Sequence, residues 1–145
     1  MDQPALALSA PEVTGDGEDG FLTMGEILGL KLNADWVVLS ACNTGAGEGA
    51  GAEAVSGLGR AFFYAGTRAL LVSNWPVETT SARTLTTSIF RRQAADPNMS
   101  RSGALNHTMI DLIDNLGYLD AEGRMVFSYS HPVFWAPFSL VADGG

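Results

Sequence analysis

The single cysteine of this chain, Cys42, stands where an α/β protein would carry a nucleophile. It comes two residues after Ser40, the end of an apolar run over 35–40 that is typical of a strand buried on both faces. In an open parallel sheet, functional residues gather at the carboxyl ends of the strands. A thiol at this position is suited to nucleophilic attack, although a free cysteine is more often a small buried apolar residue.

A glycine-rich loop follows the cysteine, with glycines at 45, 47, 49 and 51. Glycine lets a backbone approach a substrate closely, and N–H groups in such a turn can point at a developing oxyanion. Asn43, Thr44 and Gly45 are therefore the candidates for an oxyanion environment. Residues 45–50 also match the dinucleotide pattern G-x-G-x-x-A, but Gly-Ala repeats produce such matches easily, so we expect no cofactor.

The elements that position these residues alternate between strand-like and helical patterns. Thr23 with Glu26 predicts a capping box, Gly66 predicts a helix end, and Thr79–Thr80 predicts a helix start. The order implies an α/β fold with a mostly parallel sheet, incomplete on its N-terminal side. Strands are expected at 5–9, 35–40, 69–73 and 138–141, helices at 24–30, 53–64, 80–92 and 99–116, and an irregular aromatic stretch at 128–137.

Composition narrows the class of protein. The 145 residues suit one domain, 1–145, with a loop-rich acidic segment at 1–20. A net charge of -8 argues against nucleic acid as a partner. One cysteine excludes an intrachain disulfide, and no signal-peptide or membrane-span pattern is present, so we expect a cytoplasmic protein without a membrane partner. One cysteine and two distant histidines lack zinc-ligand spacing, so no metal site is expected.

Four blocks in the sequence are distinctive: VVLSACNTG at 37–45, GLGRAFFYAGT at 57–67, LVSNWPV at 71–77 and HPVFWAPF at 131–138. In this order they resemble the CHAT domain, a caspase-like cysteine peptidase domain related to caspases and separase. The segment over 21–27 fits the region that precedes the nucleophile strand in that family. The resemblance implies a three-layer caspase-like sandwich with Cys42 at the nucleophile position.

The same resemblance implies cleavage of protein substrates by thiolate attack, with a histidine from a His-Gly pair as the base. Neither histidine of this chain is followed by glycine. His107 falls in a predicted helix, and His131 belongs to the closing block, where we expect it to pack or to bond to backbone. We therefore expect the chain alone to be inactive, as the C-terminal part of a CHAT domain that lacks the His-Gly segment.

The resemblance also places Ser73, Asn74 and Glu78 along a substrate cleft, where an extended peptide could pair with backbone. Our hypothesis is that Glu78 meets a basic substrate side chain; the alternative is a solvated loop carboxylate. The expected partners are a protein or peptide substrate, with self-association or a complementary subunit at an open sheet edge. The alternative function is a noncatalytic caspase-like scaffold.

Overall fold

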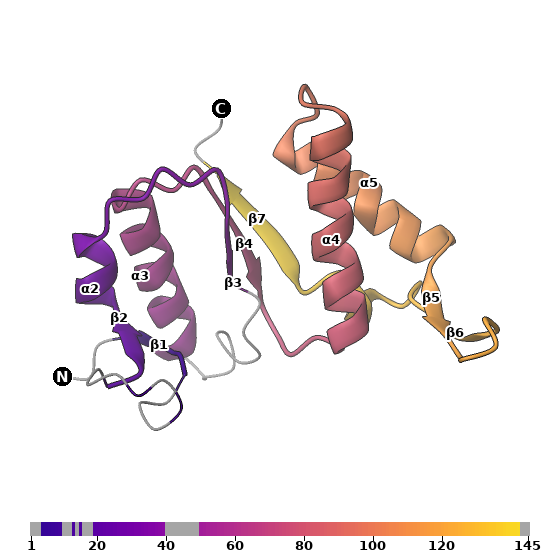
Figure 1. Ribbon diagram of the computed structural model, residues 1–145, viewed down its shortest axis with the longest axis horizontal. Coiled ribbons are helices and arrows are strands. Elements are labelled where there is room, and N and C mark those ends of the chain that lie inside the picture. The colour runs from indigo at the N-terminus through magenta and orange to yellow at the C-terminus, as the bar shows by residue number, and fades with distance from the viewer. Residues whose placement is uncertain (1–3, 10–12, 14, 16–18, 40–49, 143–145) are drawn as a thin grey trace. The chain divides into compact units, whose positions relative to one another are not determined.

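The computed structural model describes residues 4–9, 13, 15, 19–39 and 50–142, and the side chains from 57 onward in the last range. Cys42, Asn43, Thr44 and Gly45 lie outside the described residues. The fold is mixed α/β, as expected from the sequence, and the described residues include seven strands of three to five residues (Figure 1). The elements in chain order are β1 (Ala5–Ala7), β2 (Phe21–Thr23), α2 (Met24–Gly29), β3 (Val37–Leu39), α3 (Ala50–Tyr64), β4 (Ala69–Ser73), α4 (Thr79–Ala95), α5 (Arg101–Asp114), β5 (Gly117–Leu119), β6 (Met125–Ser128), a 3-10 turn (Pro132–Phe134) and β7 (Phe138–Ala142).

The strands of the described ranges form three small sheets. One has the order β3-β4-β7, and the others are the antiparallel pairs β1-β2 and β5-β6. A parallel bridge joins Ala34 to Thr67 just before β3 and β4. The chain divides into two compact units, whose described residues fall within 1–38, 44–70 and 141–145 for the first and 39–43 and 71–140 for the second.

In the first unit, a capping box starts α2 where the sequence predicts it. The backbone N–H of Glu26 donates to Thr23 Oγ1 at 3.3 Å, and the Thr23 N–H donates to Glu26 Oε2 at 2.7 Å. Both groups would otherwise be unpaired donors at a helix start. The helix buries Ile27 completely and packs against α3, which buries Leu58, Ala61 and Phe62.

Helix α3 ends at Gly66, a position that only glycine can occupy without strain. Gly66 has φ +102°, and its N–H donates to the carbonyl of Phe63 at 3.0 Å. A Cβ placed there would lie 2.1 Å from the carbonyl oxygen of Leu32, whose own N–H donates to the Ala65 carbonyl. The absent side chain therefore lets the segment before β3 run directly against the end of α3.

In the second unit, α4 and α5 pack face to face. Leu85 and Ile89 from α4 and Leu112 from α5 are fully buried, and Arg92 forms an ion pair with Asp111. Ser100 Oγ accepts from the Gly103 N–H at 3.0 Å and begins α5. The helical periodicity of the sequence predicts both helices, within a few residues at each end.

The structure corrects several sequence predictions. The strand expected over 35–40 begins at Val37 rather than at Asp35, residue 40 lies outside the described residues, and of Val37–Leu39 only Leu39 is buried. Helix α4 begins one residue earlier than expected and is capped by Glu78 rather than by Thr79 or Thr80. The sequence does not predict the antiparallel β5–β6 hairpin, because its apolar runs, at 118–119 and 125–127, are shorter than the run of about four to eight residues that indicates a strand.

Replacing Gly66 by alanine should destabilise the protein by about 3 kcal/mol, because the new Cβ meets the Leu32 carbonyl in a backbone conformation that alanine avoids. Gly123→Ala is the matched control. Gly123 has φ +79°, but no atom lies within 4 Å of the place that its Cβ would take, so only the conformational cost of about 1 kcal/mol remains. Urea unfolding of both variants measures the difference. Equal losses of unfolding free energy in the two variants would show that the contact with the Leu32 carbonyl adds nothing to the cost of the substitution.

Candidate functional site

The carboxyl end of β4 is tied to the start of β7 by one asparagine. The backbone N–H of Asn74 donates to the Pro137 carbonyl at 2.8 Å, and its side-chain Nδ2 donates to the same oxygen and to Ser139 Oγ, each at 2.8 Å. Ser73, the last residue of β4, is buried with 3% of its surface exposed. The two sequence blocks at 71–77 and 131–138 are thus joined at this point.

Glu78 caps helix α4 with both carboxylate oxygens. Its Oε1 accepts from the Thr80 N–H at 2.8 Å, and its Oε2 accepts from the Ser81 N–H at 2.6 Å. Burial acts to raise the pKa of Glu78, but the donors of Thr80 and Ser81 outweigh it and hold the pKa below its usual value of 4.5. The carboxylate is therefore charged at neutral pH, at the positive end of the helix.

An aromatic cluster forms from Tyr118, Phe127, Tyr129 and Phe134, all in the second unit. Phe127 stacks on Tyr118 and on Phe134, with ring centroids 5.3 and 5.7 Å apart. Tyr129 is the buried member, at 1% exposure. Burial raises the pKa of the Tyr129 hydroxyl, and the negative charge of Glu78 raises it further, so the cluster adjoins the Glu78 cap.

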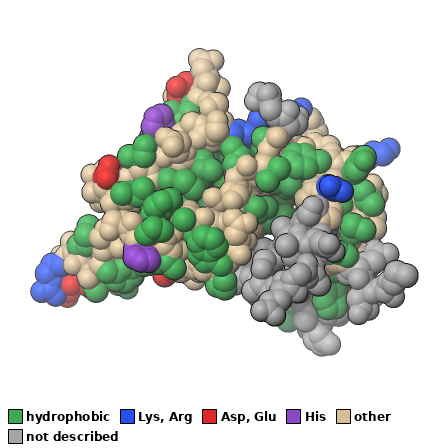
Figure 2. All heavy atoms as spheres, turned by 180° about the vertical axis from the view of Figure 1, so that it is seen from behind, with side chains coloured by type: hydrophobic (Ala, Val, Ile, Leu, Met, Phe, Trp, Pro, Cys, Tyr) green, Lys and Arg blue, Asp and Glu red, His purple; other side chains and the backbone are tan. Residues whose placement is uncertain are grey.

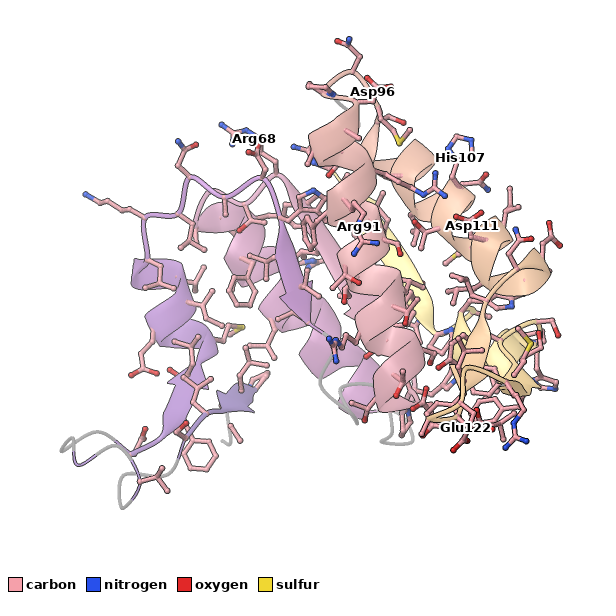
Figure 3. All side chains as sticks on the ribbon, turned by 45° about the vertical axis from the view of Figure 1, so that its right-hand side comes forward. Arg68, Arg91, Asp96, His107, Asp111 and Glu122 are labelled. Carbon is pink, nitrogen blue, oxygen red and sulfur yellow. The ribbon has the colours of Figure 1, made fainter. Side chains whose placement is uncertain are left out.

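The two histidines take structural or exposed positions. His131 Nδ1 accepts from the backbone N–H of Val133 at 3.2 Å and so begins the 3-10 turn that carries Phe134. This confirms the expectation that His131 bonds to backbone. His107 is exposed on α5, where Figure 3 shows it projecting away from α4. Within the described residues, no group of three or more potential ligands could hold a metal ion.

The predicted site residues meet different outcomes. Of the predicted cleft residues, Ser73 is buried, Asn74 uses its amide group within the fold, and Glu78 uses its carboxylate as a cap. Cys42, Asn43, Thr44 and Gly45 lie outside the described residues, so their roles stay predictions. Sequence reasoning missed Tyr129 and its aromatic neighbours; the spacing of Phe127, Tyr129 and Phe134 was the available signal.

Comparison with known proteins identifies the family. A family model described as the CHAT domain matches residues 1–144, which is nearly the whole chain. The chain therefore belongs to the CHAT domain family, a family related to caspase-like proteases. Neither curated proteins nor solved structures gave a match. Among the described residues, no helix combines the length and apolar character that crossing a membrane requires.

Replacing Glu78 by glutamine should lower the free energy of unfolding at pH 7 by about 1 kcal/mol, because the helix loses a charged cap. A carboxyl with a lower pKa in the folded chain stabilises the fold above its unfolded value, near 4.5, and this contribution disappears as pH falls through the folded pKa. As pH falls from about 7 to about 3, the free energy of unfolding, measured with urea, should therefore decrease less in Glu78→Gln than in the parent.

The control for this variant is Glu122→Gln, which removes an exposed carboxylate of the β5–β6 turn and caps no helix. We expect its stability at neutral pH to stay within about 0.5 kcal/mol of the parent. If Glu78→Gln and Glu122→Gln behave alike across the pH range, the Glu78 cap does not stabilise the fold.

Replacing Tyr129 by phenylalanine should raise the free energy of unfolding by about 1 kcal/mol. The buried Tyr129 hydroxyl makes no hydrogen bond of normal geometry among the described residues, although Glu78 lies close enough to raise its pKa, so the change removes an unsatisfied polar group and retains the ring packing. Because the pKa of Tyr129 is raised in the folded chain, the parent should lose further stability relative to the phenylalanine variant as pH rises from about 10 through the folded pKa, where the buried hydroxyl must ionise. Thermal unfolding that shows a loss instead would mean that the hydroxyl has a partner.

Proposed function

We propose that this chain is the nucleophile-bearing part of a cysteine endopeptidase of the CHAT family, in a three-layer caspase-like sandwich. The observation that carries the proposal is the family match over residues 1–144, together with Cys42 in the block that resembles the nucleophile motif. The position also supports it, because Cys42 follows β3, whose neighbour in the sheet is β4. Nucleophiles belong at such strand ends.

In the proposed reaction, the thiolate of Cys42 attacks the carbonyl carbon of the scissile peptide bond. Backbone N–H groups of Asn43, Thr44 and Gly45 stabilise the negative charge on the carbonyl oxygen. The C–N bond then breaks, the amine leaves with a proton from the general acid, and a thioester remains on Cys42. Water hydrolyses the thioester, which releases the new carboxylate and regenerates the thiol.

The base of this reaction is not assigned within the 145 residues. His131 holds the Val133 N–H on Nδ1, and His107 is exposed on α5. Neither belongs to a His-Gly pair, which is the family's pattern for the base. We therefore propose that these 145 residues alone do not cleave peptides, because a thiol of ordinary pKa, about 8.5, is mostly protonated at neutral pH.

Glu78 is proposed to select a basic side chain in the substrate. Each oxygen of its carboxylate accepts one backbone N–H in the structure. The side chains of Thr80, Ser81 and Tyr129 also act on this carboxylate, so a basic side chain would bind at a remaining lone pair or in place of one of these hydroxyls. Its lowered pKa keeps it charged at neutral pH, as binding of arginine or lysine requires. The extended segment from Ser73 to Glu78 supplies backbone groups with which a substrate strand could pair.

The second candidate is a noncatalytic scaffold. Two observations favour it: the absence of a His-Gly pair from these residues, and the engagement of His131 in a backbone hydrogen bond. A scaffold would retain the α/β core and need no reactive thiol. It would be indifferent to replacement of Cys42.

The test is cleavage of a peptide library by the natural gene product, with any residues that precede these 145, measured by mass spectrometry. We expect Cys42→Ala to abolish cleavage, by at least about 10⁴-fold, and the isolated 145 residues to give no products. Cleavage should fall after lysine or arginine in the products, and Glu78→Gln should weaken that preference by about tenfold.

Alkylation provides a control for the state of the thiol. Cys42 is the only cysteine, so alkylation of the 145 residues reports on that thiol alone. Asp114→Asn, an exposed carboxylate change on α5, should leave cleavage unchanged. Gene product that cleaves equally well with Cys42→Ala, or that cleaves nothing, would refute the peptidase proposal and favour the scaffold.

A further inference from the structure

The β5–β6 hairpin exposes more large apolar side chain than a free surface usually carries. Leu119, Met125 and Val126 are 51%, 54% and 58% exposed, and these three residues define the hairpin surface. Figure 2 shows hydrophobic side chains gathered beside a charged turn at the lower left, the place of the hairpin seen from behind. Contiguous exposed apolar residues rimmed by charge are typical of binding surfaces.

The pairing of the strands separates this surface from the aromatic cluster. Tyr118 pairs with Phe127 and their rings stack with each other, and the Phe127 ring also stacks with Phe134 on the same side of the hairpin. Leu119 pairs with Met125, after an irregularity in register between Tyr118 and Leu119. Adjacent residues of a strand face opposite sides, so Leu119 lies on the side away from the cluster.

The turn of the hairpin is held rigidly by a carboxylate. Asp120 Oδ1 accepts from the N–H groups of Glu122 and Arg124 at 3.0 and 2.8 Å, and Oδ2 pairs with Arg124 Nε at 2.9 Å. The N–H of Arg124 is the main cause that lowers the pKa of Asp120. The hairpin surface is thus presented in one conformation, and a partner loses little entropy by ordering it.

Both strands of the hairpin are edge strands, since the described sheet contains only β5 and β6. A two-stranded ribbon is marginally stable alone, and a third strand that pairs with a free edge would extend the ladder and place alternate side chains beside the hairpin surface. This geometry suits an extended peptide with large aliphatic residues at alternate positions. A helical partner would leave the edge unpaired.

Charge decides which extended segment fits. Between residues 113 and 134 the chain carries Asp114, Asp120 and Glu122 against the single cation Arg124, which already pairs with Asp120 and Glu122. A second copy of the same acidic hairpin would be repelled, whereas a basic segment would be attracted. We propose that the β5–β6 hairpin is a docking surface for a basic, aliphatic segment of a partner protein, which binds as an added strand.

The hairpin surface includes none of the proposed catalytic residues, and binding to it should not require Cys42. The probe is a fluorescein-labelled peptide of about nine residues that alternates lysine with valine. We expect fluorescence anisotropy to show binding that weakens with salt and weakens at least about tenfold for the Leu119→Thr/Val126→Thr variant. Threonine is β-branched and favours strands, so the hairpin should still form, but its apolar surface is smaller than that of leucine or valine.

Val141→Thr is the matched control, because Val141 is a comparably exposed strand residue, in β7, outside the hairpin. Circular dichroism verifies the fold, and Val126→Lys is a second variant that repels the probe at the same surface. A glutamate–valine peptide and a lysine–serine peptide should bind at least about tenfold more weakly.

Equal binding of the probe to the parent and to both hairpin variants would overturn the proposal, as would no binding to the parent. A stronger interaction with the glutamate–valine peptide would overturn the charge assignment. Sedimentation of the parent as a dimer that Leu119→Thr/Val126→Thr dissociates would identify a second copy as the occupant and would also overturn it. Cys42→Ala should bind the probe as the parent does, whatever its effect on cleavage.

Discussion

The arrangement of the candidate site depends on the hydrogen bonds of Asn74. Two donors of this residue meet the carbonyl of Pro137, and its amide group also reaches Ser139. Each such bond contributes about 1 kcal/mol, but their main effect is geometric. They fix the segment after β4 against the start of β7. The segment that leads to Glu78 and the segment that follows the 3-10 turn are therefore held in a fixed alignment.

Two local hydrogen bonds near this junction position the neighbouring aromatic residues. His131 begins the turn that carries Phe134, and the indole N–H of Trp135 donates to the Ser130 carbonyl at 3.2 Å. Phe134 then packs on Tyr129, whose buried ring adjoins Glu78. Residues far apart in sequence are therefore coupled through short contacts, and in this chain the blocks at 71–77 and 131–138 complete each other's hydrogen bonds.

The sequence predicts the elements whose local signals are strong. The capping box of Thr23 and Glu26, the glycine stop at Gly66 and the buried strand at 69–73 all occur as predicted, because each depends on neighbouring residues. Prediction is weaker where tertiary contacts decide. The hairpin strands β5 and β6 are exposed and their apolar runs are only two and three residues long, and the cap of α4 is a glutamate, a less common N-cap than the adjacent threonines. The catalytic assignment of Cys42 rests on the family resemblance.

Glu78 shows why a structural role and a binding role need not compete. A carboxylate at a helix N-terminus is held in place by two N–H groups and kept ionised by them. An anion that is already positioned loses little conformational entropy when a basic side chain arrives, so the cap prepares the group for binding. The partial positive charge of the helix weakens its attraction for a cation, however. Selectivity from Glu78 would therefore depend on the geometry of a second hydrogen bond more than on net charge, and arginine, with its planar fork of donors, would be preferred to lysine.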